Sequence, residues 1–103
     1  MAEFVIEKEI VGLGQQSSFQ QDLWVRRSCS TLHGVAPGVE WIRSYISEDK
    51  CYCVFRAPSA DVLWNLIKEW DLPPPLSICE VHQIIGPDTG EGAMKVSQEN
   101  SKA

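Results

Sequence analysis

The stretch VEWIRSYISEDKCYCVFRAPS, residues 39–59, decides the fold of this chain. Apolar and polar residues alternate along it on both sides of SEDK, a short polar segment that suits a turn. Such alternation is typical of strands with one buried face. The pattern therefore predicts a β-hairpin with strands over residues 39–46 and 51–56, in which Tyr45 stands opposite Tyr52.

The segments around this hairpin complete the order β-α-β-β-α-β. Residues 3–11 begin as an apolar strand and end at two glycines, and residues 17–34 form a helix that Ser17 or Ser18 can cap. Ser59 can cap a second helix, which three prolines at 73–75 stop. SICEVHQIIG, residues 77–86, is the last strand. This order predicts an α+β, ferredoxin-like fold, with both helices on one face of a four-stranded antiparallel sheet.

Length and composition set the remaining bounds. The chain has 103 residues, enough for one domain. We expect this domain at residues 1–87 and a flexible polar tail at 88–103, because the tail has little to bury. With a net charge of −5 and no basic run, no nucleic-acid partner is expected.

The chain also lacks the marks of a membrane or secreted protein. No segment approaches the roughly 18 apolar residues of a membrane span, and the N-terminus MAEFVIEKEI is acidic where a signal peptide would be basic. We therefore expect a cytoplasmic protein that does not bind membranes. Its cysteines should be reduced thiols packed beneath the helices. They are Cys29, Cys51, Cys53 and Cys79.

Alternation also predicts which residues face away from the helices. On that uncovered face we expect a candidate ligand pocket of aromatic and charged side chains, which are Glu7, Trp41, Arg43, Tyr45, Tyr52, Glu80 and His82. Such a face is either solvated or covered by another subunit. The exposed aromatic rings favour a homodimer that buries this face.

The hairpin resembles a small bacterial family of unknown function that is labelled nickel-binding-protein-like. The resemblance covers about residues 3–87, and the matching positions are Gly38, Val39, Trp41, Arg43, Ser44, Tyr45, Asp49, Lys50, Tyr52, Cys53, Ala57, Pro58, Ser77, Glu80 and Val81. The resemblance implies a ferredoxin-like homodimer that can hold a divalent metal, nickel in particular, and it implies no established reaction. The chain departs from the family pattern at Arg56, where a glutamate is frequent, and in its second helix, which lacks a histidine.

Three functions remain open from the sequence. The first is binding of nickel or another divalent metal, with His82, Glu80 and Glu7 as ligands, because imidazole and carboxylates suit these ions. The first and last strands are expected at opposite edges of the sheet, so a partner subunit would have to bring Glu7 to the other two ligands. The other histidine, His33, is expected to have a structural role at a helix end.

The second function is a dimeric α/β-barrel enzyme or binder acting on a small anionic organic molecule. His82 would be the general base and Arg43 the anion clamp. The third is a plain dimerisation module. No phosphate loop, dinucleotide fingerprint or nucleophile elbow occurs, so no nucleotide cofactor is expected, and no catalytic residue is assigned.

Overall fold

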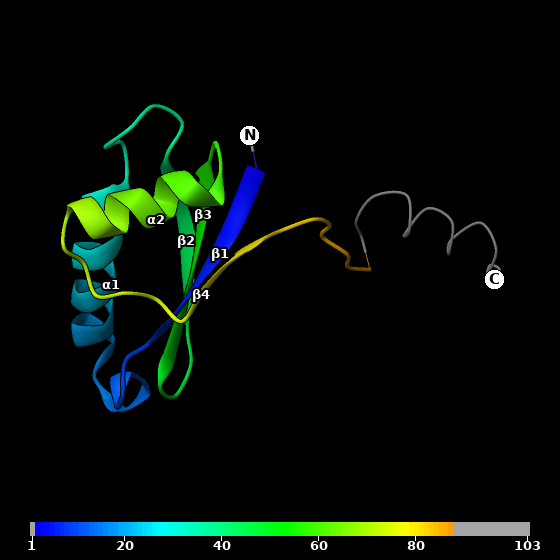
Figure 1. Ribbon diagram of the computed structural model, residues 1–103. Helices are drawn as coiled ribbons and strands as arrows, with labels where there is room; N and C mark the ends of the chain where they lie inside the picture. Colours follow the sequence, from blue (N-terminus) through cyan, green and yellow to red (C-terminus); the bar gives the residue numbers. More distant parts are fainter. Residues whose placement is uncertain (1, 88–103) are drawn as a thin grey trace, which may run out of the picture.

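A computed structural model describes residues 2–87 of the chain, so the expected tail lies outside the described residues. It shows an α+β fold of one four-stranded antiparallel sheet and two helices, as predicted (Figure 1). The strands are β1 (Ala2–Glu9), β2 (Glu40–Ile46), β3 (Lys50–Ala57) and β4 (Ser77–Glu80). The helices are α1 (Ser18–Leu32) and α2 (Ala60–Glu69), with a 3-10 turn, η1, at Leu13–Gln15.

Both helices begin at the serines that the sequence indicates. The Ser17 hydroxyl accepts the backbone N–H of Gln20 at 3.2 Å, and the Ser59 hydroxyl accepts that of Val62 at 3.3 Å. Each bond satisfies a backbone donor that the first helical turn leaves without a partner. In the part of the chain that the structure describes, neither helix is long and apolar enough to cross a membrane.

The strands lie in the order β2-β3-β1-β4, and all neighbours are antiparallel. The expectation that the first and last strands are opposite edges is wrong, because β1 is central and pairs with both β3 and β4. Each helix connects two parallel strands that have one other strand between them, as in split β-α-β units. The arrangement is consistent with the ferredoxin-like prediction, and it places β1 next to β4.

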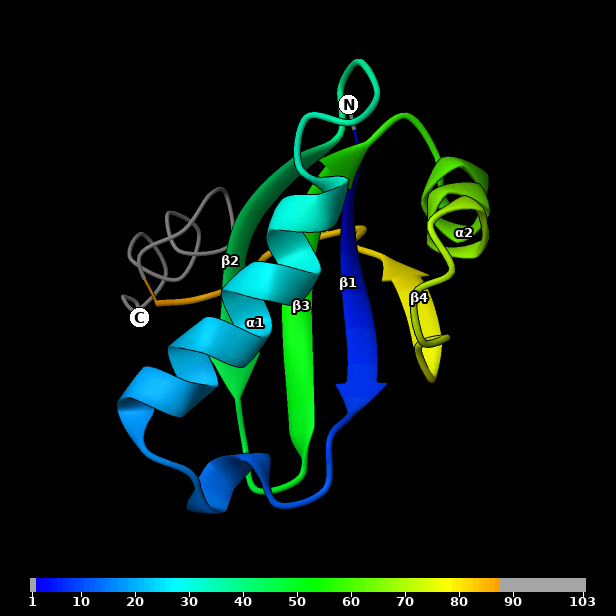
Figure 2. The same cartoon turned by 90° about the vertical axis from the view of Figure 1, so that its left-hand side faces the viewer.

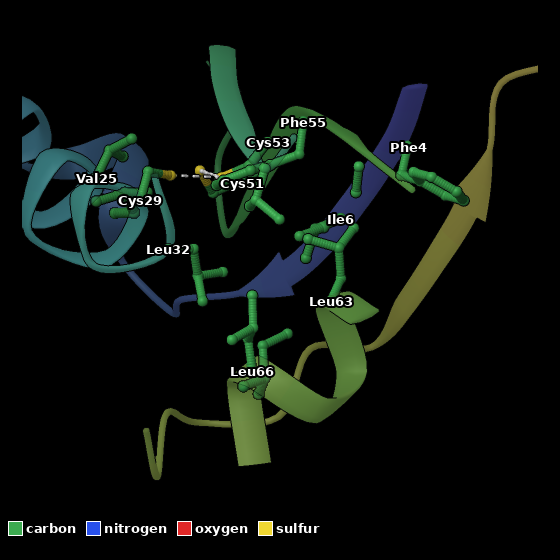
Figure 3. Packing of buried hydrophobic residues seen from close by; sticks show 14 residues of the cluster. Phe4, Ile6, Val25, Cys29, Leu32, Cys51, Cys53, Phe55, Leu63 and Leu66 are labelled. Carbon is green, nitrogen blue, oxygen red and sulfur yellow. Dashed lines mark hydrogen bonds between the residues drawn. The ribbon is translucent and has the colours of Figure 1, made fainter. Parts of the chain in front are cut away.

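The core lies between the sheet and the helices (Figure 3). Phe4, Ile6 and Phe55 of the sheet meet Leu32 of α1 and Leu63 of α2, and all five side chains are buried. Fully burying a large apolar side chain contributes about 1.5–3 kcal/mol. This layer therefore fixes one face of the sheet against the helices and leaves the other face uncovered.

A β-bulge changes the face on which Trp41 lies. The pairing of β2 with β3 shifts register so that Arg43 stands opposite Val54 and Trp41 opposite Phe55. One extra residue, Ile42, is therefore accommodated in β2. Because Phe55 is buried beneath the helices, Trp41 lies on the helix side. The expectation that Trp41 lies on the uncovered face is wrong.

The side chains of β4 also face the opposite sides of the sheet from those expected. Ile6 stands opposite Ile78 and Phe4 opposite Glu80, so both β4 residues are on the helix side. Cys79 consequently faces the other way and is exposed. The predictions that Glu80 shares the uncovered face and that Cys79 is buried beneath the helices are both wrong. Ile78 and Cys79 are both apolar, and a shift by one residue reverses every side chain of a strand.

The segment after β1 packs against the turn of the hairpin. The backbone N–H of Gly14 donates to the carbonyl of Glu48 at 2.7 Å, and that of Gly12 donates to Asp49 Oδ1 at 2.8 Å. A Cβ atom at position 14 would lie 2.7 Å from the Cα atom of Glu48. Glycine is required there because the two backbones approach so closely.

Candidate functional site

The side of the sheet without helices is called the open face below. By strand register it carries charged, hydroxyl and aromatic side chains, together with one thiol. They are Glu3, Glu7, Glu9, Glu40, Arg43, Tyr45, Lys50, Tyr52, Arg56, Ser77 and Cys79, with Val5 and Val54 between them.

Glu7 stands at the centre of a polar group on the open face. Lys50 Nζ donates to Glu7 Oε2 at 2.8 Å, and the Ser77 hydroxyl donates to Oε1 at 3.3 Å. The hydrogen bond from Lys50 lowers the pKa of Glu7 below its usual value near 4.5, and the same bond raises the pKa of Lys50. Glu7 is therefore a carboxylate at neutral pH, held by an ammonium that a metal would have to displace.

Arg43 and Tyr45 form a second polar group, on the outer strand β2. Arg43 Nε donates to the Tyr45 hydroxyl at 2.7 Å, and the guanidinium carbon lies 5.8 Å from the centre of the same ring. Tyr45 is 54 % exposed. No carboxylate within residues 2–87 makes a salt bridge with Arg43. The remaining guanidinium donors therefore face solvent.

Arg56, the position where the family pattern departs, is paired within the sheet. Its guanidinium lies 3.4 Å from a Glu40 oxygen and 3.8 Å from a Glu3 oxygen. These partners are its cross-strand neighbours on β2 and β1. Opposite charges on adjacent strands stabilise a sheet by about 0.2–1 kcal/mol per pair. Arg56 thus has a structural role on the open face.

Trp41 belongs to the helix side and not to the candidate pocket. Its indole N–H donates to the Ser44 hydroxyl at 3.0 Å, and the Arg26 guanidinium of α1 lies 5.8 Å from the ring centre. The ring also packs against the buried core. These contacts attach α1 to the outer strand of the sheet.

Glu80 and His82 lie at the other edge of the sheet. Glu80 is the last residue of β4, and His82 follows the strand, so the last strand is shorter than predicted. Both side chains are exposed. They line a shallow hollow of about 300 Å³ together with Glu3. An imidazole and two carboxylates are therefore close to one edge of the sheet.

The structure does not gather all the predicted ligands in one subunit. Glu7 lies on the open face and Glu80 on the helix side of β4. Within residues 2–87, no group of three histidine, cysteine or acidic side chains is placed to hold a metal ion.

His82 and Arg43, the base and the clamp of the enzyme hypothesis, are also far apart. They belong to opposite edges of the sheet, which are three strand spacings, about 14 Å, from each other. One subunit therefore does not combine them into a single site.

The second histidine of the chain, His33, has the expected structural role. It follows the last residue of α1, and its Nδ1 accepts the backbone N–H of Trp41 at 2.9 Å. This bond links the end of α1 to the start of β2.

Three of the four cysteines lie together in the core between α1 and β3. Cys29 Sγ is 3.2 Å from Cys53 Sγ, and Cys51 Sγ is 3.6 Å from the same atom (Figure 3). Hydrogen bonding to Cys53, together with burial, raises the pKa of the Cys29 and Cys51 thiols. The bonds from these two thiols lower the pKa of Cys53, against the effect of its own burial.

Sequence reasoning did not include Lys50, Ser77 and Cys79 in the site. Lys50 and Ser77 both contact Glu7, and Cys79 Sγ donates to the Ser77 hydroxyl at 3.9 Å. Lys50 could have been found from the hairpin, because it lies two residues before Tyr52 and so shares its face. Ser77 and Cys79 could not, since they depend on the phase of β4.

The fold and the site define a small α+β protein with an uncovered sheet face that carries carboxylate, basic and aromatic groups. Residues 4–84 match the family described as SCO4226-like, nickel responsive protein. The chain belongs to this family. No curated protein and no solved structure matches the chain.

Proposed function

We propose that this protein binds a divalent metal, nickel, at a site that two copies of the chain build together. Membership of a nickel-responsive family is the observation that carries this proposal. The ligands are His82, Glu80 and Glu7, and the open face is the surface through which the two copies pair.

The donor chemistry of these residues fits nickel. Imidazole nitrogen is a common ligand of nickel in proteins, and carboxylate oxygens complete mixed nitrogen and oxygen sites. His82 and Glu80 are exposed, so their lone pairs are accessible to an ion. Glu7 is a carboxylate at neutral pH, and the hydrogen bond from Lys50 lowers its pKa below the usual value.

A site shared between subunits follows from the placement of the donors. Within residues 2–87, one subunit does not bring three suitable groups together. A second subunit over the open face that extends past the β4 edge would bring the partner's Glu7 towards His82 and Glu80. Pairing through this face would also remove Tyr45, which is 54 % exposed, from water.

Lys50 is the competitor of the metal. It holds Glu7 Oε2 at 2.8 Å, so nickel must displace the ammonium to use that oxygen. Lys50→Gln leaves Glu7 without this charge partner. We therefore expect Lys50→Gln to raise nickel affinity.

Equilibrium dialysis of the untagged protein against nickel at neutral pH tests the proposal. His82→Ala should abolish binding, and Glu80→Gln and Glu7→Gln should each weaken it by about tenfold or more, in line with the cost of losing contacts to a metal site. His33→Asn removes the only other imidazole of the chain, and Glu69→Gln removes an exposed carboxylate on α2. Both controls should bind nickel like the parent protein, provided that circular dichroism shows them folded.

Two results would overturn the assignment. One is nickel binding that His82→Ala leaves unchanged. The other is an equal loss in His82→Ala and in a folded His33→Asn variant, because the effect would then not depend on the sheet edge.

A further inference from the structure

A cleft opens between the two helices, on the side of the sheet opposite to the open face. Figure 2 shows α1 across β2 and β3, and α2 set apart from it on the side of β4. The cleft has a volume of about 340 Å³ and is lined by the end of β1, by α1 and by the segment that follows α2. Protein pockets for small molecules span roughly 300–1,000 Å³, so this cleft suits a small ligand.

Most of the wall is apolar. Trp24 of α1 lines it and is 48 % exposed. Ile67 of α2 and Leu72 form the facing wall, which two of the prolines extend. An indole ring beside aliphatic side chains and prolines accommodates a flat ring or a short alkyl chain.

Two basic side chains, Lys8 and Arg27, and one acidic residue, Glu9, line the same cleft. Glu9 is exposed and stands opposite Lys50, so its carboxylate points to the open face and, among the described residues, forms no salt bridge with either basic group. Lys8 stands opposite Cys51, which places it on the helix side of the sheet. Its ammonium donates to the neutral Ser28 hydroxyl at 2.5 Å, and Arg27 precedes that serine on α1. Within residues 2–87, no salt bridge involves Lys8 or Arg27.

In the described part of the chain, some other basic residues of the fold do have an acidic partner, unlike Lys8 and Arg27. Lys50 pairs with Glu7, and Arg26, the direct neighbour of Arg27, pairs with Asp22 at 2.9 Å. A half-buried ammonium has given up part of its hydration and gains most from an anion. The guanidinium beside it is suited to hold a carboxylate through two parallel hydrogen bonds.

We propose that the interhelical cleft binds a small organic monocarboxylate with an apolar body, such as an aromatic or short-chain alkyl acid. The carboxylate lies between Lys8 and Arg27. The apolar body lies against Trp24, Ile67 and Leu72. This site is separate from the metal site, because Lys8 and Glu7 are adjacent on β1 and face opposite sides of the sheet.

The test uses phenylacetate and its neutral amide, phenylacetamide, as probes of the same shape. Each is titrated into the ¹⁵N-labelled full chain in a buffer with a metal chelator, and the indole N–H resonances are followed by NMR. Trp24→Phe assigns the Trp24 signal. We expect saturable binding of one phenylacetate per chain with a shift of the Trp24 resonance. The amide should bind at least about tenfold more weakly, because charge-assisted bonds are about twice as strong as neutral ones.

Substitutions of two neighbouring arginines distinguish a positive charge inside the cleft from one outside it. Arg27→Met should weaken phenylacetate binding about tenfold or more, whereas Arg26→Met, the matched control, should leave it unchanged. Arg27 is exposed, so its replacement leaves the core intact. Lys8→Met should weaken binding to a similar degree. The proposal is overturned if the amide binds as well as the acid, if both arginine variants have the same effect, or if the Trp24 resonance shows no saturable change.

Discussion

Replacing Cys79 with serine tests the placement of side chains on the two faces of the sheet. The structure leaves Cys79 exposed on the open face and buries Cys29, Cys51 and Cys53, each at no more than 1 % exposure. A thiol reagent reaches Cys79 directly. It reaches the other three only when the structure opens.

The expected difference in rate follows from the stability of a domain. Small domains have free energies of unfolding of about 5–15 kcal/mol, so at most roughly one molecule in several thousand is unfolded at a time. If the buried thiols react through that state, they should be labelled at least about a thousandfold more slowly than Cys79. Direct reaction of Cys29 and Cys51 in the native state is also disfavoured, because hydrogen bonding to Cys53 and burial raise their pKa and the thiolate is the reacting form.

The assay follows the reaction of the dilute native protein with 5,5′-dithiobis(2-nitrobenzoate). We expect one thiol per chain in a fast phase, and that phase should be missing in Cys79→Ser. The fast phase should slow as protein concentration rises, since a partner over the open face would cover Cys79. Two or more fast thiols, or a fast phase that persists in Cys79→Ser, would refute the assignment of β4 residues to the two faces.

Three further substitutions test single contacts of the fold. Ser59→Ala should lower the free energy of unfolding by about 1 kcal/mol through loss of the α2 cap, measured by urea denaturation, and an unchanged value would contradict the capping role. Gly14→Ala should destabilise the fold by about 1–3 kcal/mol, because its methyl group would meet the Glu48 backbone and neither backbone can yield without a local shift; a wild-type melting temperature would contradict this contact. The lowered pKa of Glu7 means that its ion pair with Lys50 stabilises the fold above pH 4.5 and that this contribution is lost as the pH falls further. Glu7→Gln should therefore show a smaller loss of stability than the parent protein between neutral pH and the acid range, and parallel curves would argue against the pair.

Much of the fold is readable from local chemistry. The two serine caps and the turn of the hairpin act over three or four residues, so the sequence predicts them directly. The pairing of Tyr45 with Tyr52 also holds, because the short turn sets that register. Near the turn, Arg43, Tyr45 and Tyr52 therefore lie on the open face, as the alternation predicts.

The errors arise where the register depends on contacts elsewhere. The bulge at Ile42 allows Trp41 to pack beneath α1, an outcome that strict alternation cannot anticipate. The phase of β4 is set by burial of Ile78 opposite Ile6, while its own sequence fits either phase. As a result, Trp41 and Glu80 lie on the helix side and not on the open face, and Cys79 lies on the open face.

Native mass spectrometry of the untagged protein with nickel tests most directly whether the metal binds at a site shared by two subunits. One spectrum reports both the number of chains and the number of metal ions in each species. We expect a dimer that carries nickel, and no bound nickel in His82→Ala under the same conditions. Nickel bound to a monomer, or no bound nickel at all, would contradict this expectation.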